Sequence, residues 1–354
     1  MVQTVTIARP DDMHLHLRDG EMLKTVLPYS VRQFGRAIVM PNLKPPITSV
    51  EAARAYRERI LAAVPENTSF EPLMTAYLCD GTDFATIEEG FVERVFAAAK
   101  LYPAGATTHS EYGVTSIDKV AKVLDVMQDL GMPLLVHGES TDPAVDVFDR
   151  EAVFIERTLI PLLERHTRLK VVLEHITTEQ AANFVASDTS GRLAATITPQ
   201  HLLLNRNAMF TGGMRPHYYC LPVLKRERHR LALRKVATSG SRSFFLGTDS
   251  APHERGMKEA SCGCAGIFSA PNALEAYLTV FEEENAVEKF EAFASENGRL
   301  FYGLPPNEGT ITLTRQPTDA PELVQLSEGK SIQTFMGMGA LPWRLVDQKS
   351  HPSY

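Results

Sequence analysis

Short apolar runs rich in β-branched and small residues recur along the chain, and longer amphipathic segments separate them. Runs of this length and composition are typical of buried strands. We predict strands at residues 5–8 running on toward 17, 37–40, 71–78, 95–101, 133–137, 170–175, 193–198 and 243–247. Helical periodicity between them predicts helices at residues 50–64, 116–131, 150–166, 179–186 and 222–239.

The regular alternation of strand and helix predicts the architecture. Repeated strand–helix units favour a parallel sheet, and eight of them favour its closure into a (β/α)8 TIM barrel. A doubly wound open sheet is the alternative. Helices at residues 273–284 and 290–302 follow the eighth strand, and short strands such as 310–314 come after about Gly309. We therefore expect one barrel domain, residues 1–308, and a C-terminal extension, residues 309–354, packed on it.

Composition and charge narrow the class of protein. Hydrophobic residues make up 44% and charged residues 22% of the 354 residues, which is typical of a globular enzyme. The net charge is −7 and no basic block occurs, so we expect neither a nucleic acid nor a membrane surface as a partner. Four cysteines are too few for a disulfide framework in a chain this long. With neither a signal-peptide pattern nor an apolar run long enough to span a bilayer, we expect a cytoplasmic protein.

Residue types that bind metals stand at the carboxyl ends of the predicted strands. They are His14, His16, Lys100, His137, His175 and Asp249. In a closed α/β barrel, active sites are built at this rim. Residues two apart on a strand point the same way, so His14 and His16 can present two imidazoles to one ion.

Each of these residues also has an ordinary structural explanation when taken alone. A histidine after an apolar run is more often a hydrogen-bonded core residue, and Asp249 could cap a helix. Four histidines and one aspartate at strand ends are together hard to explain as core residues, because buried imidazoles and carboxylates need partners. A shared metal centre would satisfy all five.

Lys100 is the unusual member of the set. It follows a small apolar run, so its side chain is expected to point into the mouth of the barrel. A buried amine beside cations would lose its proton. The neutral amine could then take up carbon dioxide as a carbamate that bridges two metal ions. A lysine that extends to the rim, or that binds substrate directly, explains the sequence equally well.

Arg18 stands two residues beyond His16, on the same face of the first strand. Its planar guanidinium suits a carboxylate because it donates two parallel hydrogen bonds. The alternative is a surface ion pair with Asp19 or Glu21, which would contribute little stability. Substrate contact is the interpretation that its position favours.

Several longer motifs resemble those of the amidohydrolase superfamily and, within it, the short single-domain dihydroorotases. They are DDMHLHLR at residues 11–18, MPNL at 40–43, KLYPAGATT at 100–108, LVHGE at 135–139, LEHIT at 173–177, TPQHL at 198–202, TDSAPH at 248–253 and SCGCAG at 261–266. The motifs occur in family order over essentially the whole chain.

The resemblance implies roles for individual residues. It implies two zinc ions per subunit: His14, His16 and Asp249 would hold one, His137 and His175 the other, and Lys100, as N6-carboxylysine, would bridge them with a hydroxide. Substrate contacts would come from Arg18, Asn42 and His253 at the substrate carboxylate, from His137, and from the backbone of Leu221 and Ala265 at the ring amide. Thr107 and Thr108 would lie on a mobile loop that closes over the substrate.

The activity implied by the resemblance is the reversible cyclisation of N-carbamoyl-L-aspartate to (S)-dihydroorotate in pyrimidine (UMP) biosynthesis, with Asp249 as general acid and base. A homodimer is also implied. Two alternatives stay open: another cyclic-amide hydrolase, such as a hydantoinase or allantoinase, and a catalytically silent barrel that acts as a scaffold. The carboxylate contacts argue against the first, and the complete ligand set argues against the second.

Overall fold

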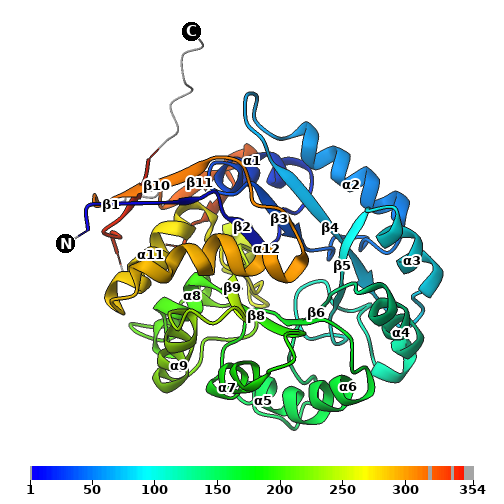
Figure 1. The fold of residues 1–354 in the computed structure, drawn as a ribbon. Helices are drawn as coiled ribbons and strands as arrows, with labels where there is room; N and C mark the ends of the chain where they lie inside the picture. The colour runs from blue at the N-terminus through cyan, green and yellow to red at the C-terminus, as the bar shows by residue number, and fades with distance from the viewer. Residues whose placement is uncertain (1, 318–320, 336–338, 347–354) are drawn as a thin grey trace.

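The computed structural model describes residues 2–317, 321–335 and 339–346 of the chain. Eight parallel strands form the central sheet in sequence order. They are β2 (Asp11–Leu15), β3 (Arg36–Val39), β4 (Glu71–Leu78), β5 (Phe96–Leu101), β6 (Leu134–Val136), β7 (Val171–Leu173), β8 (Leu193–Ile197) and β9 (Phe244–Leu246). The last strand returns to the first, since Leu15 forms a parallel bridge with Ser250 just beyond β9. The predicted (β/α)8 barrel is therefore confirmed (Figure 1).

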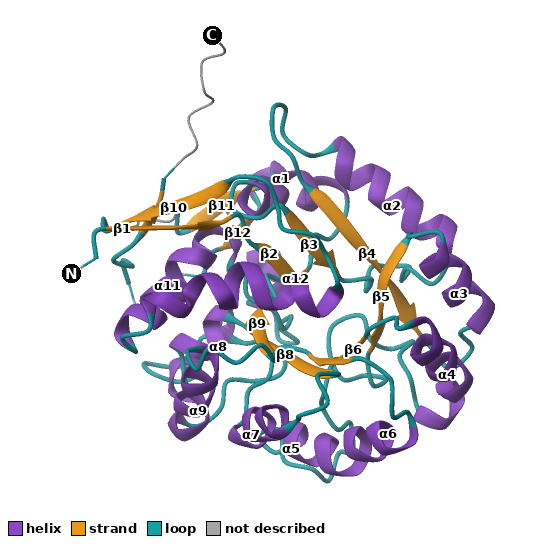
Figure 2. Ribbon diagram, in the orientation of Figure 1, coloured by secondary structure: helices purple, strands orange, loops and turns teal. Residues whose placement is uncertain are grey.

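Helices surround the strands as an outer ring (Figure 2). The α-helices are α1 (Gly20–Val31), α2 (Val50–Ala62), α3 (Phe84–Val92), α4 (Ala121–Leu130), α5 (Arg150–Phe154), α6 (Ile160–Arg165), α7 (Glu179–Ser187), α8 (Pro199–Leu203), α9 (Glu227–Ala237), α10 (Arg255–Lys258), α11 (Ala273–Glu283) and α12 (Asn297–Tyr302). Two π-helical segments, η2 (Ile155–Leu159) and η7 (Ala292–Glu296), precede α6 and α12. The 3-10 turns are η1 (Ile117–Val120), η3 (Arg206–Met209), η4 (Pro216–Tyr218), η5 (Ala270–Asn272), η6 (Val287–Lys289) and η8 (Ser327–Gly329).

Side-chain caps explain where several helices begin. Ser49 accepts a hydrogen bond from Ala52 N before α2, and Thr178 accepts one from Ala181 N before α7. Each satisfies a backbone donor that has no partner within the helix. The expected helix at 222–239 begins only at Glu227, because Val223 and Leu224 are buried in succession as irregular backbone rather than on one helical face.

The first strand was predicted as one continuous run, but the structure divides it into two strands. Residues 4–8 form β1 (Thr4–Ala8), which lies outside the barrel, and β2 begins separately at Asp11. Pro10 stands between them and has no backbone N–H to continue a ladder. β1 instead pairs antiparallel with β10 (Thr310–Thr314), which was predicted as a strand.

Short strands beside the barrel hold the C-terminal part of the described chain. β13 (Arg344–Leu345) pairs with β10, and β11 (Leu323–Gln325) pairs with β12 (Ser331–Gln333). Trp343 is buried, and its Nε1 donates to Glu282 of α11 at 3.1 Å. The division at residue 308 stays a prediction, and residues 318–320, 336–338 and 347–354 of the proposed extension lie outside the described part.

The core has two layers that follow the alternation of side chains along each strand. Inside the barrel lie Met13, Ile38, Met40, Ala98, Leu135, Val172, Ala194 and Phe245. Strand residues between these positions, such as Leu134 and Val136 on either side of Leu135, pack outward against the helices. The alternation therefore assigns most residues of the barrel strands to the interior or to the helix layer.

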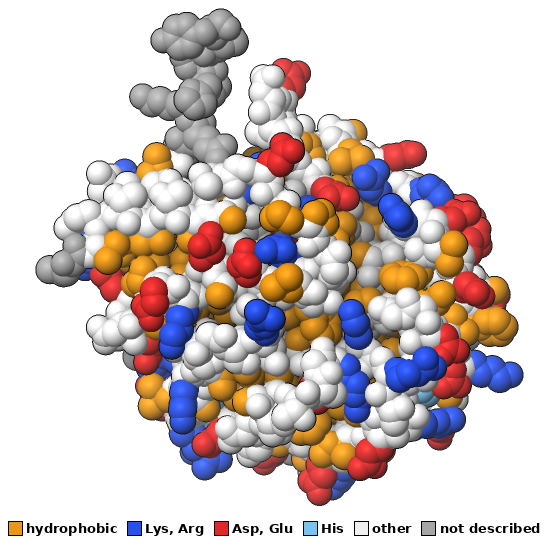
Figure 3. All heavy atoms as spheres, in the orientation of Figure 1, with side chains coloured by type: hydrophobic (Ala, Val, Ile, Leu, Met, Phe, Trp, Pro, Cys, Tyr) orange, Lys and Arg blue, Asp and Glu red, His pale blue; other side chains and the backbone are white. Residues whose placement is uncertain are grey.

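The surface in Figure 3 intersperses Lys and Arg with Asp and Glu. Such mixing produces no strong field of one sign over this face. Among the described residues, no helix is long and apolar enough to cross a membrane.

Candidate active site

Strand alternation carries the predicted site residues to the barrel mouth. Lys100 stands two positions beyond the interior residue Ala98, and His137 two positions beyond Leu135. Asn42 likewise follows Met40 by two. Because these strands are parallel, their carboxyl ends meet at one rim. The rim cavity is lined by His14, His16, Arg18, Asn42, Tyr102, Thr107, Thr108, His137, His175, Leu221, Asp249, Ala251, Ala265 and Gly266.

Three rim residues leave their strands through an uncommon backbone conformation. Arg18, His175 and Asp249 have φ values of 60°, 41° and 44°. Non-glycine residues rarely adopt this left-handed region, and such residues concentrate at functional sites. The surrounding contacts therefore hold these side chains in place at a conformational cost.

His14, His16 and Asp249 form a compact group. Asp249 Oδ1 lies 3.5 Å from His14 Nε2 and 3.1 Å from His16 Nε2, and the two imidazole nitrogens are 3.3 Å apart. All three residues are buried, and their ligand atoms lie within 4.8 Å of one another. Imidazole nitrogens and a carboxylate at this spacing can hold one divalent cation.

His137, His175 and Lys100 continue the group into the barrel. The ring centroid of His175 lies 4.9 Å from that of His14 and 4.9 Å from that of His137. The amine of Lys100 is completely buried, 5.1 Å from the centroid of the Tyr102 ring. The structure thus brings all six predicted ligands together.

Burial favours the forms of these groups that bind metals. It lowers the pKa of His16 to about 3, and it lowers the pKa of His175 well below its usual value, so both imidazoles are neutral. Burial also lowers the pKa of Lys100 to about 8. For Asp249, burial raises the pKa, but the hydrogen bond with His16 and electrostatic interactions with neighbours that include Lys100 outweigh it and bring the pKa to about 2.

The residues present fit a metal centre with a modified lysine. Lys100 Nζ and His175 Nδ1 are buried without a hydrogen-bond partner in the described part of the chain. Such atoms are costly to leave unsatisfied. A bound cation would satisfy the imidazole nitrogen, and conversion to a carbamate would give the lysine metal-binding oxygens. An imidazole-rich donor set suits zinc better than magnesium.

Carboxylates behind the histidines orient them, and the sequence reasoning assigned them no role. Glu174 Oε2 lies 2.6 Å from His14 Nδ1 and accepts from Thr196 Oγ1 at 2.7 Å. Glu139 Oε2 lies 2.9 Å from His137 Nε2. Each contact occupies one ring nitrogen and leaves the other for a ligand. Only their positions in the motifs, next to His175 and two beyond His137, could have indicated them.

Asp12 supports the site from below. It accepts hydrogen bonds from His14 N at 3.1 Å and from Thr248 N at 2.9 Å, and its second oxygen accepts from Thr248 Oγ1 at 2.6 Å. This carboxylate joins the start and end of the barrel directly beneath His14 and Asp249. Closure of the barrel and the spacing of these two residues therefore depend on the same contacts.

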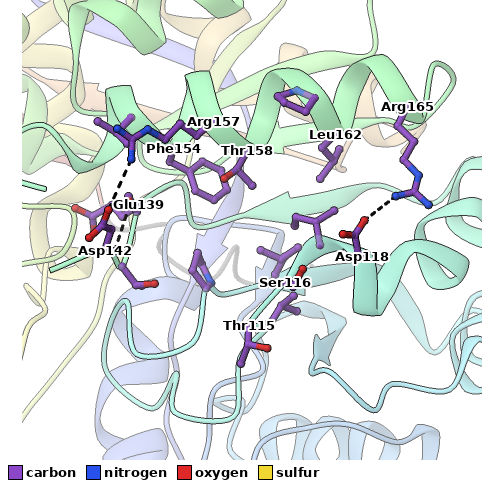
Figure 4. A pocket seen from close by; sticks show the side chains of 18 residues that line it. Thr115, Ser116, Asp118, Glu139, Asp142, Phe154, Arg157, Thr158, Leu162 and Arg165 are labelled. Carbon is purple, nitrogen blue, oxygen red and sulfur yellow. Dashed lines mark hydrogen bonds and ion pairs between the residues drawn. The ribbon is translucent and has the colours of Figure 1, made fainter. Parts of the chain in front are cut away.

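A larger cavity of about 640 Å³ lies beside the site and shares no lining residue with it. Figure 4 shows Glu139 in its wall and two ion pairs across it, Arg157 with Asp142 and Arg165 with Asp118. Glu139 therefore separates this cavity from His137.

Replacing Glu174 with glutamine should weaken zinc binding about 10- to 100-fold, because His14 loses the carboxylate that orients its imidazole. Competition with a chromophoric chelator measures the affinity. Glu275→Gln is the matched control, since Glu275 is also buried but lies on α11 and accepts from Leu345 N. Unchanged zinc affinity in Glu174→Gln would contradict the orienting role.

The predicted substrate contacts form a second group at the rim. Arg18 Nε donates to Pro252 O at 3.1 Å, and Arg18 Nη2 lies 3.1 Å from His253 Nε2. The same His253 nitrogen lies 2.9 Å from Ala265 O. A neutral ring nitrogen can accept from Arg18 or donate to Ala265, but it cannot do both. Which of the two contacts is a hydrogen bond therefore depends on the tautomer of His253.

The loop with Thr107 and Thr108 lies over the cavity. Thr108 O accepts from Asn42 Nδ2 at 3.1 Å, and Thr108 Oγ1 donates to Ala265 O at 3.3 Å. Ser110 fastens the turn internally, accepting from Thr107 N at 2.8 Å and donating to Thr107 O. The enclosed volume is about 20 Å³, which is room for little more than one water molecule. The loop thus covers the cavity.

Comparisons with known proteins agree with this geometry. Residues 9–316 match the amidohydrolase family model. A dihydroorotase of Novosphingobium aromaticivorans is 59% identical over 346 residues, covering 98% of this chain and 99% of that protein. The crystal structure of a dihydroorotase from Campylobacter jejuni is 36% identical with a TM-score of 0.88, and the match covers 98% of each chain. The crystal structure of the Saccharomyces cerevisiae dihydroorotase in complex with 5-fluoroorotic acid is 31% identical with a TM-score of 0.89, and the match covers 98% of this chain and 99% of that one. The chain therefore belongs to the amidohydrolase family and, within it, to the dihydroorotases.

Proposed function

We propose that the protein catalyses the reversible cyclisation of N-carbamoyl-L-aspartate to (S)-dihydroorotate, in pyrimidine biosynthesis. One observation carries the proposal. A single rim cavity joins a set of metal-binding residues to Arg18, whose guanidinium suits a substrate carboxylate and lies 3.1 Å from His253 Nε2. The dihydroorotases with which the chain shares about 60% identity support the same activity.

We propose that two zinc ions bind here. His14, His16 and Asp249 would hold one, His137 and His175 the other, and Lys100 would bridge them as a carbamate. The zinc pair would lower the pKa of a water molecule and polarise the ring carbonyl. The convergence of these side chains and the unpaired amine of Lys100 support this arrangement.

Asp249 would act as the general acid and base. Its low pKa means that it begins as a carboxylate, able to accept a proton from the attacking water. It would return that proton to the ring nitrogen as the C–N bond breaks. In the synthetic direction it would remove the proton from the ureido nitrogen that attacks the side-chain carboxyl carbon.

Recognition would depend on the second group of rim residues. Arg18, Asn42 and His253 would bind the substrate's α-carboxylate, and His137 would also contact the substrate. The backbone of Leu221 and Ala265 would meet the ring amide. Ala265 O already accepts a hydrogen bond from Thr108 Oγ1, so the same residue would contact both the loop and the ring amide.

A direct assay tests the proposal. The purified protein should hydrolyse dihydroorotate, followed by the loss of ring absorbance, and metal analysis should find zinc. Hydantoin and allantoin serve as neutral-ring comparisons, since they lack the carboxylate that Arg18 would bind. Preference for a neutral ring would favour a hydantoinase-like activity, and zinc binding without turnover of any of these substrates would favour a silent scaffold.

Thr107→Ala and Thr108→Ala should each lower turnover about 100-fold without removing zinc, because a loop that no longer closes misplaces the bound substrate. Steady-state kinetics and zinc content measure the two effects. Thr115→Ala is the control, because Thr115 is exposed and its hydroxyl donates to Asp80 at 2.7 Å, away from the site cavity. Full activity in both loop variants would refute the lid role.

We also propose that the protein is a cytoplasmic homodimer, as the family resemblance implies. The four cysteines are free, which suits a reducing compartment. Sedimentation velocity on the zinc-loaded protein would test the dimer.

A further inference from the structure

A buried lysine outside the proposed ligand set binds three backbone carbonyls. Lys258, at the end of α10, is 5% exposed, and its Nζ donates to Tyr219 O at 2.9 Å, Cys264 O at 3.0 Å and Gly266 O at 2.5 Å. An ammonium group has three N–H donors, so all are used. No acidic side chain in the described part of the chain forms an ion pair with Lys258.

The three carbonyls belong to two segments at the rim of the candidate site. Cys264 and Gly266 flank Ala265, whereas Tyr219 lies two residues before Leu221. Gly266 N also donates to Tyr219 O at 3.0 Å, so the two segments are joined directly as well as through the lysine. Lys258 is thus bonded to both stretches of backbone that carry proposed substrate contacts.

The carbonyl directions explain how this bonding affects the cavity. The carbonyls of residues 264 and 266 accept from Lys258, whereas the carbonyl of Ala265 between them has other partners. The Ala265 carbonyl accepts from Thr108 Oγ1 at 3.3 Å and lies 2.9 Å from His253 Nε2. The position of Lys258 therefore fixes which backbone group of this segment is presented to the substrate cavity.

The segment has little room to shift. Gly266 has a φ of 149°, and a Cβ atom built there would lie 2.6 Å from Ala251 O and 2.9 Å from His253 Nε2. Any displacement of residues 264–266 would therefore disturb His253 and the lining of the cavity. Interiors packed this closely transmit such displacements.

We propose that Lys258 is a positioning residue that sets substrate affinity by holding the backbone of Leu221 and Ala265 against the ring amide. This role rests on the proposed function. Simple packing does not explain a lysine here, because a methionine of similar length would fill the same space without the cost of burying an ammonium. Burial lowers the pKa of Lys258 to about 8, which reflects that cost.

The kinetic test compares Lys258→Met with Lys258→Arg. The methionine variant should lose about 100-fold in kcat/KM for dihydroorotate, mostly through a higher KM. Correctly placed backbone groups would stabilise the bound substrate and the transition state equally, and the variant would lose this stabilisation in both. Arginine keeps the positive donors and should retain more of the affinity. Zinc content should not change in either variant.

Lys225→Met is the matched control. Lys225 is 4% exposed and donates to a backbone carbonyl, Val223 O, at 2.9 Å, but in the described part of the chain its side chain forms no hydrogen bond with residues 219–221 or 264–266. Its loss should lower stability and leave KM within about twofold of the wild type. An equal rise of KM in Lys225→Met would overturn the specific role of Lys258, and so would a wild-type KM in Lys258→Met.

Amide hydrogen exchange tests the positioning without relying on catalysis. In the wild type, the amide of Gly266 should be protected, and peptides covering 219–221 and 264–266 should exchange about tenfold faster or more in Lys258→Met. If the wild-type amide exchanges like an open loop, the proposal fails even when no variant folds. If the Gly266 amide is protected but the protein does not hydrolyse dihydroorotate, the proposed function is wrong. The structural role of Lys258 would then still stand.

Discussion

Replacing Lys100 with methionine will leave a folded barrel that has lost its turnover, with kcat lower by on the order of 10⁴-fold, as for other residues that act as part of one catalytic unit. Methionine has a similar length, so the interior of the barrel stays filled. The variant lacks the amine that would carry the bridging carbamate. Zinc content should therefore fall from about two ions per subunit to about one, as measured by metal analysis after gel filtration.

The stability of the same variant separates a lost metal bridge from a damaged fold. Lys100 Nζ is completely buried without a hydrogen-bond partner in the described residues, so the metal-free methionine variant should have a Tm no lower than the metal-free wild type. Lys170→Met is the control, because Lys170 donates to Phe301 O at the opposite end of the barrel. Full zinc loading and turnover in Lys100→Met would show that this lysine does not bridge the ions.

Asp249→Asn should lower kcat by on the order of 10³- to 10⁴-fold, since the amide keeps the shape of the side chain but cannot accept and return a proton. KM should change much less, because Arg18 and His253, the proposed contacts of the substrate carboxylate, are unchanged. Steady-state kinetics in both directions measure the loss. Zinc content, measured on the same samples, distinguishes a missing proton carrier from a missing ligand.

A buried aspartate at the other end of the barrel provides the control for this variant. Asp11 accepts from Arg36 Nε at 2.9 Å and Nη2 at 2.8 Å, beneath the barrel. Asp11→Asn should lower the Tm, because it leaves a buried guanidinium without its partner, while kcat of the folded enzyme stays near the wild-type value. A kcat within tenfold of wild type for zinc-loaded Asp249→Asn would exclude the proposed acid–base role.

Alternation within strands made much of the barrel predictable. A side chain two residues beyond an interior position faces the interior again, and this relation places Lys100 after Ala98 and His137 after Leu135. The pattern failed at the first strand because Pro10 interrupts the ladder, which an apolar run does not reveal. It also failed at residues 222–226, because residues 222–225 are buried in succession as irregular backbone and the helix begins only at Glu227.

Other features of the site depend on contacts between distant parts of the chain. The pairing of His14 with Glu174 joins residues 160 positions apart, and Asp12 reaches Thr248 across 236. The three bonds of Lys258 depend on two loops whose conformations follow no periodic pattern. The position of the Thr108 loop over the cavity likewise depends on Asn42 and Ala265.

The sequence by itself determined the repeated strand–helix order of the barrel, the faces that most strand residues occupy and the chemical types that follow the strands, because backbone geometry imposes these relations over a few residues. Only the tertiary structure decided which nitrogen of His14 and of His137 contacts a carboxylate, how closely His16 and Asp249 approach, and which carbonyl the loop of Ala265 presents to the cavity. These depend on how the barrel closes and how its loops pack, and both are set by contacts between residues far apart in the chain.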